Sequence, residues 1–134
     1  TDDLQAAAGK PTLLFRASEA AWPRPFGALG RTANRVTDGP FLYRLAGGNL
    51  LMLWSTGGYE GYAMGYAISE SGSVLGPWRQ SKAPIYGGDG GHGMLFRDFA
   101  GRLWITLHQP NKHPNERPLW LEVVERDGGL ILKS

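Results

Sequence analysis

The chain has 134 residues, the length of one domain or of part of a larger one, and its 20 glycines and 9 prolines predict frequent turns. Five residues each of Trp, Tyr and Phe, with only 19% charged residues, argue against disorder. The net charge is +2 with scattered basic residues, cysteine is absent, and no apolar run reaches about 18 residues, so we expect no nucleic-acid partner, no disulfide or thiolate zinc site and no membrane span.

Residues 1–36 are predicted to hold little regular structure beyond an outer strand and a loop. Residues 11–16 (PTLLFR) form a short apolar run between turn signals, and we expect one isolated strand there. Prolines and glycines interrupt every periodic pattern in residues 18–34, which indicates a long irregular loop. The chain starts at Thr1 without Met and carries no signal-peptide pattern, so we expect a trimmed start and leave the compartment open.

Residues 37–86 are expected to form one four-stranded unit. The predicted strands span residues 39–44, 50–56, 61–69 and 76–80. The third strand alternates small and large residues, which suits a strand packed between two sheets. The fourth has a proline near its start, where no donor to the ladder is needed.

Residues 87–134 repeat this pattern. When the segment from residue 38 is placed on the segment from residue 91, 53 residues further on, the matched positions carry the same residue in four pairs: Leu42 and Leu95, Arg44 and Arg97, Gly48 and Gly101, Leu50 and Leu103. The predicted strands of the second unit span residues 91–97, 103–108, 118–124 and 129–133. A repeat of about 50 residues with four strands is typical of a β-propeller blade. The predicted fold is therefore all-β, a propeller fragment of two to three blades.

Two blades and one extra strand do not close a ring of about four to eight blades. An open ring would expose apolar sheet faces, here including Leu13, Phe15 and Ile131. We therefore expect the chain to associate with a second copy or with a complementary propeller fragment.

The repeat places two polar side chains near the entrances of successive inner strands, Asp38 and His92. The innermost strand of a blade lines the central channel, so these two groups should face a common axial pocket. Three aromatic residues are expected nearby, Trp22, Trp54 and Tyr59. A carboxyl group, an imidazole and aromatic rings together suit a carbohydrate, whose apolar ring face stacks while its hydroxyls meet polar groups.

Five motifs, in order along the chain, resemble the C-terminal part of the catalytic domain of family 43 glycoside hydrolases. They are TDGPFLYR (37–44), LMLWS (51–55), GPW (76–78), GHGM (91–94) and HQPN (108–111). The resemblance covers nearly the whole chain. It implies a five-bladed propeller that hydrolyses α-L-arabinofuranosyl or β-D-xylosyl linkages of plant cell-wall polysaccharides with inversion.

The resemblance also implies roles for three residues. Asp38 takes the position of the general acid, in Asp-Gly-Pro where the family usually has Glu-Gly-Pro. His92 lies on the channel axis near a bound water or ion, commonly calcium, although no cofactor is required. Arg117 corresponds to a substrate-binding arginine. The general base and a second, tuning carboxylate would precede residue 1, so blades outside this chain would complete the active site.

Simpler interpretations stay open beside these roles. Asp38 before Gly-Pro is also typical of a turn acid, and His92 could be a core histidine with satisfied hydrogen bonds. Trp54, Trp78 and Trp104 suit an inter-blade core, and His108 suits a structural or surface role. Asp89 would be solvated or line the pocket mouth. The alternative for the whole chain is a non-catalytic half-propeller that binds carbohydrate or self-assembles.

Overall fold

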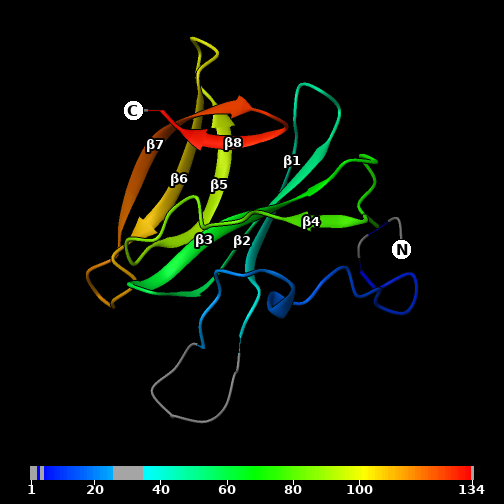
Figure 1. Ribbon diagram of the computed structural model, residues 1–134, viewed down its shortest axis with the longest axis horizontal. Coiled ribbons are helices and arrows are strands. Elements are labelled where there is room, and N and C mark those ends of the chain that lie inside the picture. The colour runs from blue at the N-terminus through cyan, green and yellow to red at the C-terminus, as the bar shows by residue number, and fades with distance from the viewer. Residues whose placement is uncertain (1–2, 4, 26–34, 134) are drawn as a thin grey trace.

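Two four-stranded antiparallel sheets make up the fold in a computed structural model, which describes residues 3, 5–25 and 35–133 (Figure 1). The first sheet has the order β1-β2-β3-β4 and the second β5-β6-β7-β8, so each is a simple meander. The strands are β1 (Asp38–Arg44), β2 (Leu50–Gly58), β3 (Gly61–Ser69), β4 (Trp78–Gln80), β5 (Gly91–Arg97), β6 (Leu103–Gln109), β7 (Arg117–Arg126) and β8 (Gly129–Leu132). The predicted all-β class and the two four-stranded units are confirmed.

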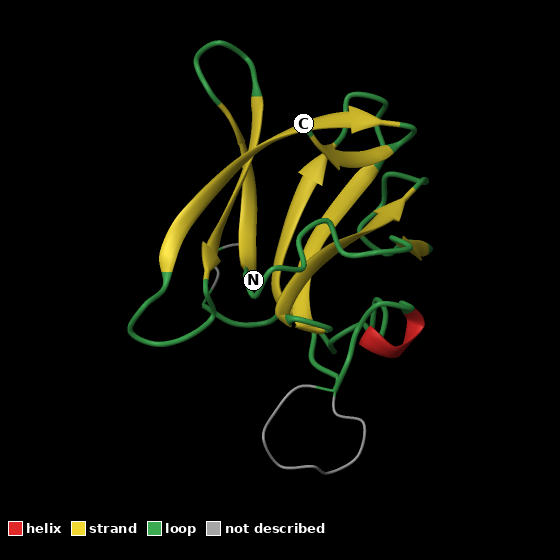
Figure 2. Cartoon of the chain, turned by 60° about the vertical axis from the view of Figure 1, so that its left-hand side comes forward, coloured by secondary structure: helices red, strands yellow, loops and turns green. Residues whose placement is uncertain are grey.

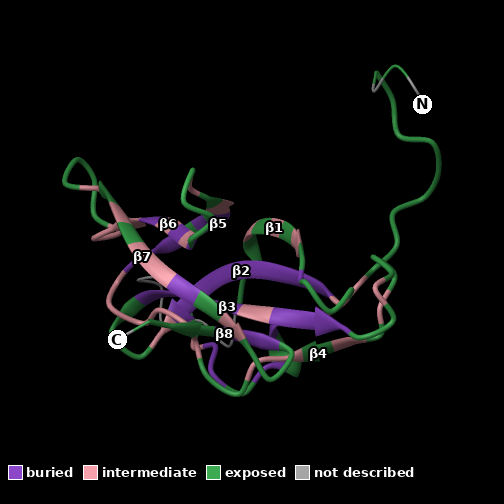
Figure 3. Ribbon diagram, turned by 90° about the horizontal axis from the view of Figure 1, so that it is seen from above, coloured by how far each residue is buried: buried purple, intermediate pink, exposed green. Residues whose placement is uncertain are grey.

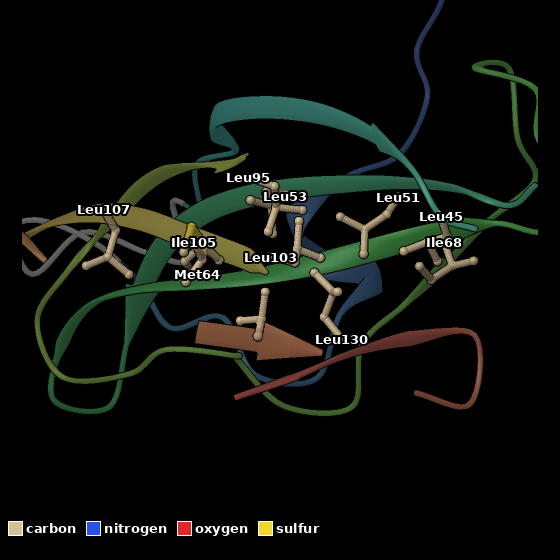
Figure 4. Close-up of a cluster of buried hydrophobic side chains, with 11 residues drawn as sticks. Leu45, Leu51, Leu53, Met64, Ile68, Leu95, Leu103, Ile105, Leu107 and Leu130 are labelled. Atoms are coloured by element: carbon tan, nitrogen blue, oxygen red, sulfur yellow. The ribbon is translucent and has the colours of Figure 1, made fainter. Parts of the chain in front are cut away.

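The main core lies between the two sheets. Leu51 and Leu53 of β2 and Ile105 of β6 are fully buried there, because alternate residues of each strand point to the facing sheet. Figure 3 shows that β2 and β3, at the centre of the first sheet, carry most of its buried residues. Figure 4 shows the side chains of this inter-sheet core: Leu45, Leu51, Leu53, Met64, Ile68, Leu95, Leu103, Ile105, Leu107, Val123 and Leu130.

The repeat is visible in the backbone. Both inner strands are irregular where they begin, between Asp38 and Phe41 in β1 and between Gly91 and Met94 in β5. Gly39 and His92, which are 53 residues apart, have positive φ angles of 54° and 53°. A bulge of the same kind therefore changes the direction of the chain at the start of each inner strand.

Glu125 of β7 links the two sheets at the other end of the strands. One carboxylate oxygen accepts a hydrogen bond from the backbone N–H of Ala46 at 2.7 Å, and the other pairs with the guanidinium of Arg97 at 3.0 Å. Ala46 belongs to the β1–β2 turn, so a single carboxylate ties one blade to the next.

The N-terminal segment differs from the prediction. Residues 11–16 are not a strand: they have no regular structure and lead into the 3-10 helix η1 (Ala17–Glu19), the short helix of Figure 2. Part of the apolar run still packs: the half-buried Phe15 lies 5.6 Å, centroid to centroid, from Trp54 on the outer face of the first sheet, while Leu13 is 64% exposed.

The other departures are small. In the predicted loop, residues 18 and 19 belong to η1, residues 20–25 are irregular as expected, and the remainder, residues 26–34, lies outside the described residues. Strand β4 begins at Trp78 instead of residue 76, since Pro77 has no N–H to donate. No helix in the described part of the chain is long and apolar enough to cross a membrane.

Candidate active site

Asp38 and His92 come together where β1 and β5 begin side by side. The His92 Nδ1 atom lies 3.4 Å from the Asp38 Oδ2 atom. Gly39 makes this approach possible: a β-carbon at that position would lie 2.8 Å from the Cδ2 and Cγ atoms of the His92 ring. The predicted pairing of the two groups at neighbouring inner strands is thus present in the structure, and both side chains are about half exposed, 51% for Asp38 and 57% for His92.

The Asp38 carboxylate is held on both of its oxygens. The Tyr62 hydroxyl donates to Oδ2 at 2.6 Å, and the Gly39 N–H donates to Oδ1 at 2.9 Å. The hydrogen bond from Tyr62, aided by His92 and opposed by burial, lowers the pKa of Asp38 below its usual value. Asp38 is therefore ionised at neutral pH in this chain.

His92 is fixed through its backbone. Its φ is positive, which a non-glycine residue rarely adopts, and its N–H donates to the buried Ser55 Oγ at 2.9 Å. The flanking glycines are required by space: a β-carbon at Gly91 would lie 2.7 Å from the Tyr62 ring and 2.8 Å from Ser55 Oγ. The Gly-His-Gly motif is thus a close crossing of β5 over the first sheet that leaves the imidazole exposed.

Tyr62 is the site residue that the sequence analysis missed. It is 4% exposed, and its ring stacks on His108 with ring centroids 5.7 Å apart. Asp89 Oδ1 accepts the Tyr62 N–H at 3.0 Å, and Asn111 Oδ1 lies 2.9 Å from His108 Nε2. Asp89 and His108 therefore belong to the frame of the site. The signal that could have found Tyr62 is the antiparallel order itself, which returns the start of the third strand to the edge where Asp38 lies.

His92 and Arg117 line one cavity of about 370 Å³, together with His108 and Glu116. The Arg117 guanidinium is exposed and donates to the carbonyl oxygens of Pro114 and Glu116 at 3.2 and 2.7 Å. The structure thus places Asp38 against His92, and His92 in one cavity with Arg117, while Asp38 itself lines a separate cavity of about 350 Å³.

None of the three aromatic residues lines the cavity of His92 and Arg117, although Trp54 contributes to the lining of the Asp38 cavity. Trp22 is 4% and Trp54 1% exposed, and their rings pack on each other at 4.7 Å in a small core on the outer face of the first sheet. The expectation of an exposed sugar platform is thus not met at Trp22, because the irregular segment that carries it folds back over β2 and β3. Tyr59 is exposed but lies under the Arg24 guanidinium, which covers its ring and contacts its hydroxyl, beside a separate cavity of about 390 Å³.

No group of three or more His, Asp or Glu side chains in the described part of the chain could hold a metal ion. These side chains alone therefore do not supply the roughly six to eight oxygen ligands that calcium takes. We assign no chemical step to a metal.

Several solved structures are similar to this chain in sequence and fold. An endo-arabinase from Bacteroides thetaiotaomicron is 45% identical, with a TM-score of 0.86 over 96% of this chain and 45% of that chain. A thermostable family-43 glycoside hydrolase is 27% identical, with a TM-score of 0.61 over 75% of this chain and 36% of that chain. An endo-1,4-beta-xylanase from Bacteroides thetaiotaomicron is 25% identical, with a TM-score of 0.62 over 74% of this chain and 38% of that chain.

No family model and no curated protein matches the chain. The chain spans less than half the length of each of these three solved structures, so the likeness concerns part of their fold. In sequence and in fold, the chain is part of a propeller of glycoside hydrolase family 43.

Proposed function

We propose that the chain is part of an inverting glycosidase that acts on α-L-arabinofuranosyl or β-D-xylosyl linkages of plant cell-wall polysaccharides. The observation that carries this proposal is the Asp38–His92 pair at the start of two inner strands, in a chain 45% identical over 96% of its length to an endo-arabinase. That likeness favours arabinofuranosyl linkages over xylosyl ones.

In the proposed reaction Asp38 is the general acid and protonates the glycosidic oxygen as the bond to the anomeric carbon breaks. A carboxylate from a completing blade removes a proton from the attacking water on the opposite face of the sugar. The two carboxyl groups of such an inverting pair stand roughly 6.5–9.5 Å apart, which leaves room for the water. Asp38 must then carry its proton at working pH, and the nearby negative charge of the completing carboxylates would raise its pKa, opposing Tyr62 and His92.

His92 and Arg117 are proposed to bind the substrate beside Asp38. Both line the same cavity, and both present polar atoms to solvent. The planar guanidinium of Arg117 suits a bidentate contact with two neighbouring hydroxyls of a sugar. The His92 ring would orient the sugar, or a water next to it, against the Asp38 carboxyl group.

The completing blades are proposed to come from a complementary propeller fragment or from a second copy. Support comes from the outward faces of both sheets. Leu42 on β1 and Val74 before β4 are 43% and 45% exposed, and Trp120 and Ile131 on the second sheet are 63% and 39% exposed. Apolar faces of this kind, adjoining a packed inter-sheet core, suit a further blade.

The test combines molar mass in solution with release of 4-nitrophenol from 4-nitrophenyl α-L-arabinofuranoside and β-D-xyloside. The proposal expects turnover by the completed enzyme, meaning this chain together with the blades that close its ring. Asp38→Asn should lose turnover of an arabinan oligosaccharide, whose leaving oxygen needs a proton, and should be affected less with the 4-nitrophenyl glycosides. Asp127→Asn is the matched control, because Asp127 is 93% exposed in a distant turn. Failure of the completed enzyme to hydrolyse either glycoside or arabinan and xylan oligosaccharides would refute the proposal and leave the non-catalytic half-propeller.

A further inference from the structure

We propose that Tyr62 is the positioning residue of Asp38, holding its carboxylate in one orientation from beneath. The contact between the two residues does not depend on the proposed function; only its consequence for catalysis rests on that function. Tyr62 is almost completely buried whereas Asp38 is half exposed, so the hydroxyl reaches the carboxylate from the protein interior.

The two hydrogen bonds to the Asp38 carboxylate are made to different oxygens, from Gly39 to Oδ1 and from Tyr62 to Oδ2. The backbone bond from Gly39 joins neighbouring residues and moves with the turn. The Tyr62 bond joins β3 to the start of β1 across 24 residues of sequence, and at 2.6 Å it has the length of a strong O–H···O⁻ bond. Tyr62 is thus the group that ties the orientation of Asp38 to the first sheet as a whole.

Tyr62 is itself held rigidly, which a positioning residue requires. Its backbone N–H donates to Asp89, and one ring face stacks on His108, which Asn111 anchors. Gly91 leaves no spare room at the edge of the ring, since a β-carbon there would lie 2.7 Å from the Tyr62 Cε1 atom. Residues of the second unit therefore fix where the hydroxyl points.

His92 is the other titratable side chain against Asp38, and its longer 3.4 Å contact comes from a half-exposed ring. An exposed imidazole at that distance restricts a carboxylate less than a buried phenol at hydrogen-bonding distance does. We therefore expect Asp38 to become free to rotate when the Tyr62 hydroxyl alone is removed.

The experiment measures side-chain order at Asp38 by NMR. Three-bond couplings from the Asp38 Cγ atom to its backbone nitrogen and carbonyl carbon report whether χ1 occupies one rotamer or several. We expect single-rotamer couplings in the unmodified chain and averaged couplings in Tyr62→Phe. Tyr66→Phe is the matched control and should keep single-rotamer couplings, because Tyr66 lies on the same strand but donates to the Leu130 carbonyl oxygen.

Unchanged single-rotamer couplings in Tyr62→Phe would overturn the proposal. If Tyr62→Phe does not fold, the unmodified chain still decides: its Tyr62 hydroxyl proton should give a slowly exchanging resonance that moves upfield in Asp38→Asn. A hydroxyl resonance that is unaffected by Asp38→Asn would overturn it as well.

A second readout follows the reaction in the completed enzyme. Tyr62→Phe should lower kcat by about tenfold to a hundredfold with KM little changed, since misplacing a catalytic group by about 1 Å costs rates of that order. An unchanged kcat in Tyr62→Phe would overturn the catalytic consequence. Absence of turnover in every version, including the unmodified enzyme, would refute the proposed function, while the couplings would still decide the role of Tyr62.

Discussion

Replacing Gly91 by alanine tests whether the Gly-His-Gly motif is required by the close crossing of β5 over the first sheet. The new β-carbon would lie 2.7 Å from the Tyr62 ring and 2.8 Å from Ser55 Oγ, whereas ordinary contacts are 3.4–4 Å. At least one strand must therefore shift by several tenths of an ångström. Gly91 has no positive φ, so steric overlap is the only obstacle to alanine.

The magnitude follows from two opposing effects. Overpacking a well-packed region costs about 1–3 kcal/mol, and the upper half of that range applies because Tyr62 and Ser55 are buried and cannot swing away. Replacing glycine by alanine also restricts the unfolded chain, which stabilises by about 0.4–1 kcal/mol. The net loss in free energy of unfolding is about 1–2.5 kcal/mol, which lowers the melting temperature by about 3–10 °C for a chain of this size.

Thermal unfolding followed by circular dichroism measures this loss. Gly87→Ala is the matched control in the same glycine-rich segment, because a β-carbon there would meet only Pro84 at 3.7 Å, an ordinary contact. It should leave the melting temperature unchanged or slightly raised. A Gly91→Ala protein as stable as the Gly87→Ala protein would refute the close crossing of β5 over Tyr62 and Ser55.

Three further predictions concern the core, the inter-blade link and acid stability. Leu53→Ala leaves a cavity at a fully buried site in the inter-sheet core and should lower the free energy of unfolding, measured in urea, by about 2–5 kcal/mol. Leu75→Ala, at a residue 67% exposed, is the control and should change that free energy by no more than about 0.5 kcal/mol. Equal losses would contradict the position of the core. Glu125→Gln should lower the free energy of unfolding by about 1 kcal/mol in the same assay, because it weakens the bonds of this side chain to the Ala46 N–H in the β1–β2 turn and to Arg97. The loss should be smaller at high salt, and a loss independent of salt would argue against an ionic link. Although burial works in the opposite direction, hydrogen bonds from Trp104 and a neighbouring arginine lower the pKa of Asp98 to about 2, below its unfolded value of about 3.9. The stability that Asp98 contributes is therefore present above about pH 4 and lost as the pH falls toward 2, so Asp98→Asn should melt below the unmodified chain at neutral pH and together with it near pH 2.

The strands and the repeat could be predicted because they depend on local patterns. Matching residues 53 positions apart, such as Arg44 and Arg97, cap equivalent turns by donating to the carbonyl oxygens of Gly48 and Gly101. The error at residues 11–16 has a physical cause. A short apolar run predicts burial; Phe15 is partly buried, but against the face of a sheet and not along the edge of a strand, and Leu13 stays exposed.

The candidate site was predictable only in part. Asp38 and His92 could be placed by the repeat, because they lie at nearly equivalent positions of successive inner strands. The strand order could place Tyr62 at the same end of the first sheet as Asp38, but the contact between the two side chains across β2, with the ring of His108 against Tyr62, depends on the tertiary structure. Trp22 was expected at the pocket because aromatic residues in loops often are exposed; its burial depends on the path of the irregular N-terminal segment over Trp54.

The role of Asp38 as general acid is the central proposal, and it is tested most directly by varying the leaving group. In the completed enzyme, Asp38→Asn should lower kcat/KM for a methyl α-L-arabinofuranoside or an arabinan oligosaccharide, whose leaving oxygens need a proton, far more than for the 4-nitrophenyl glycoside, whose phenolate leaves unaided. We expect the gap between the two losses to be at least about a hundredfold. An equal loss for both kinds of substrate would contradict proton donation by Asp38.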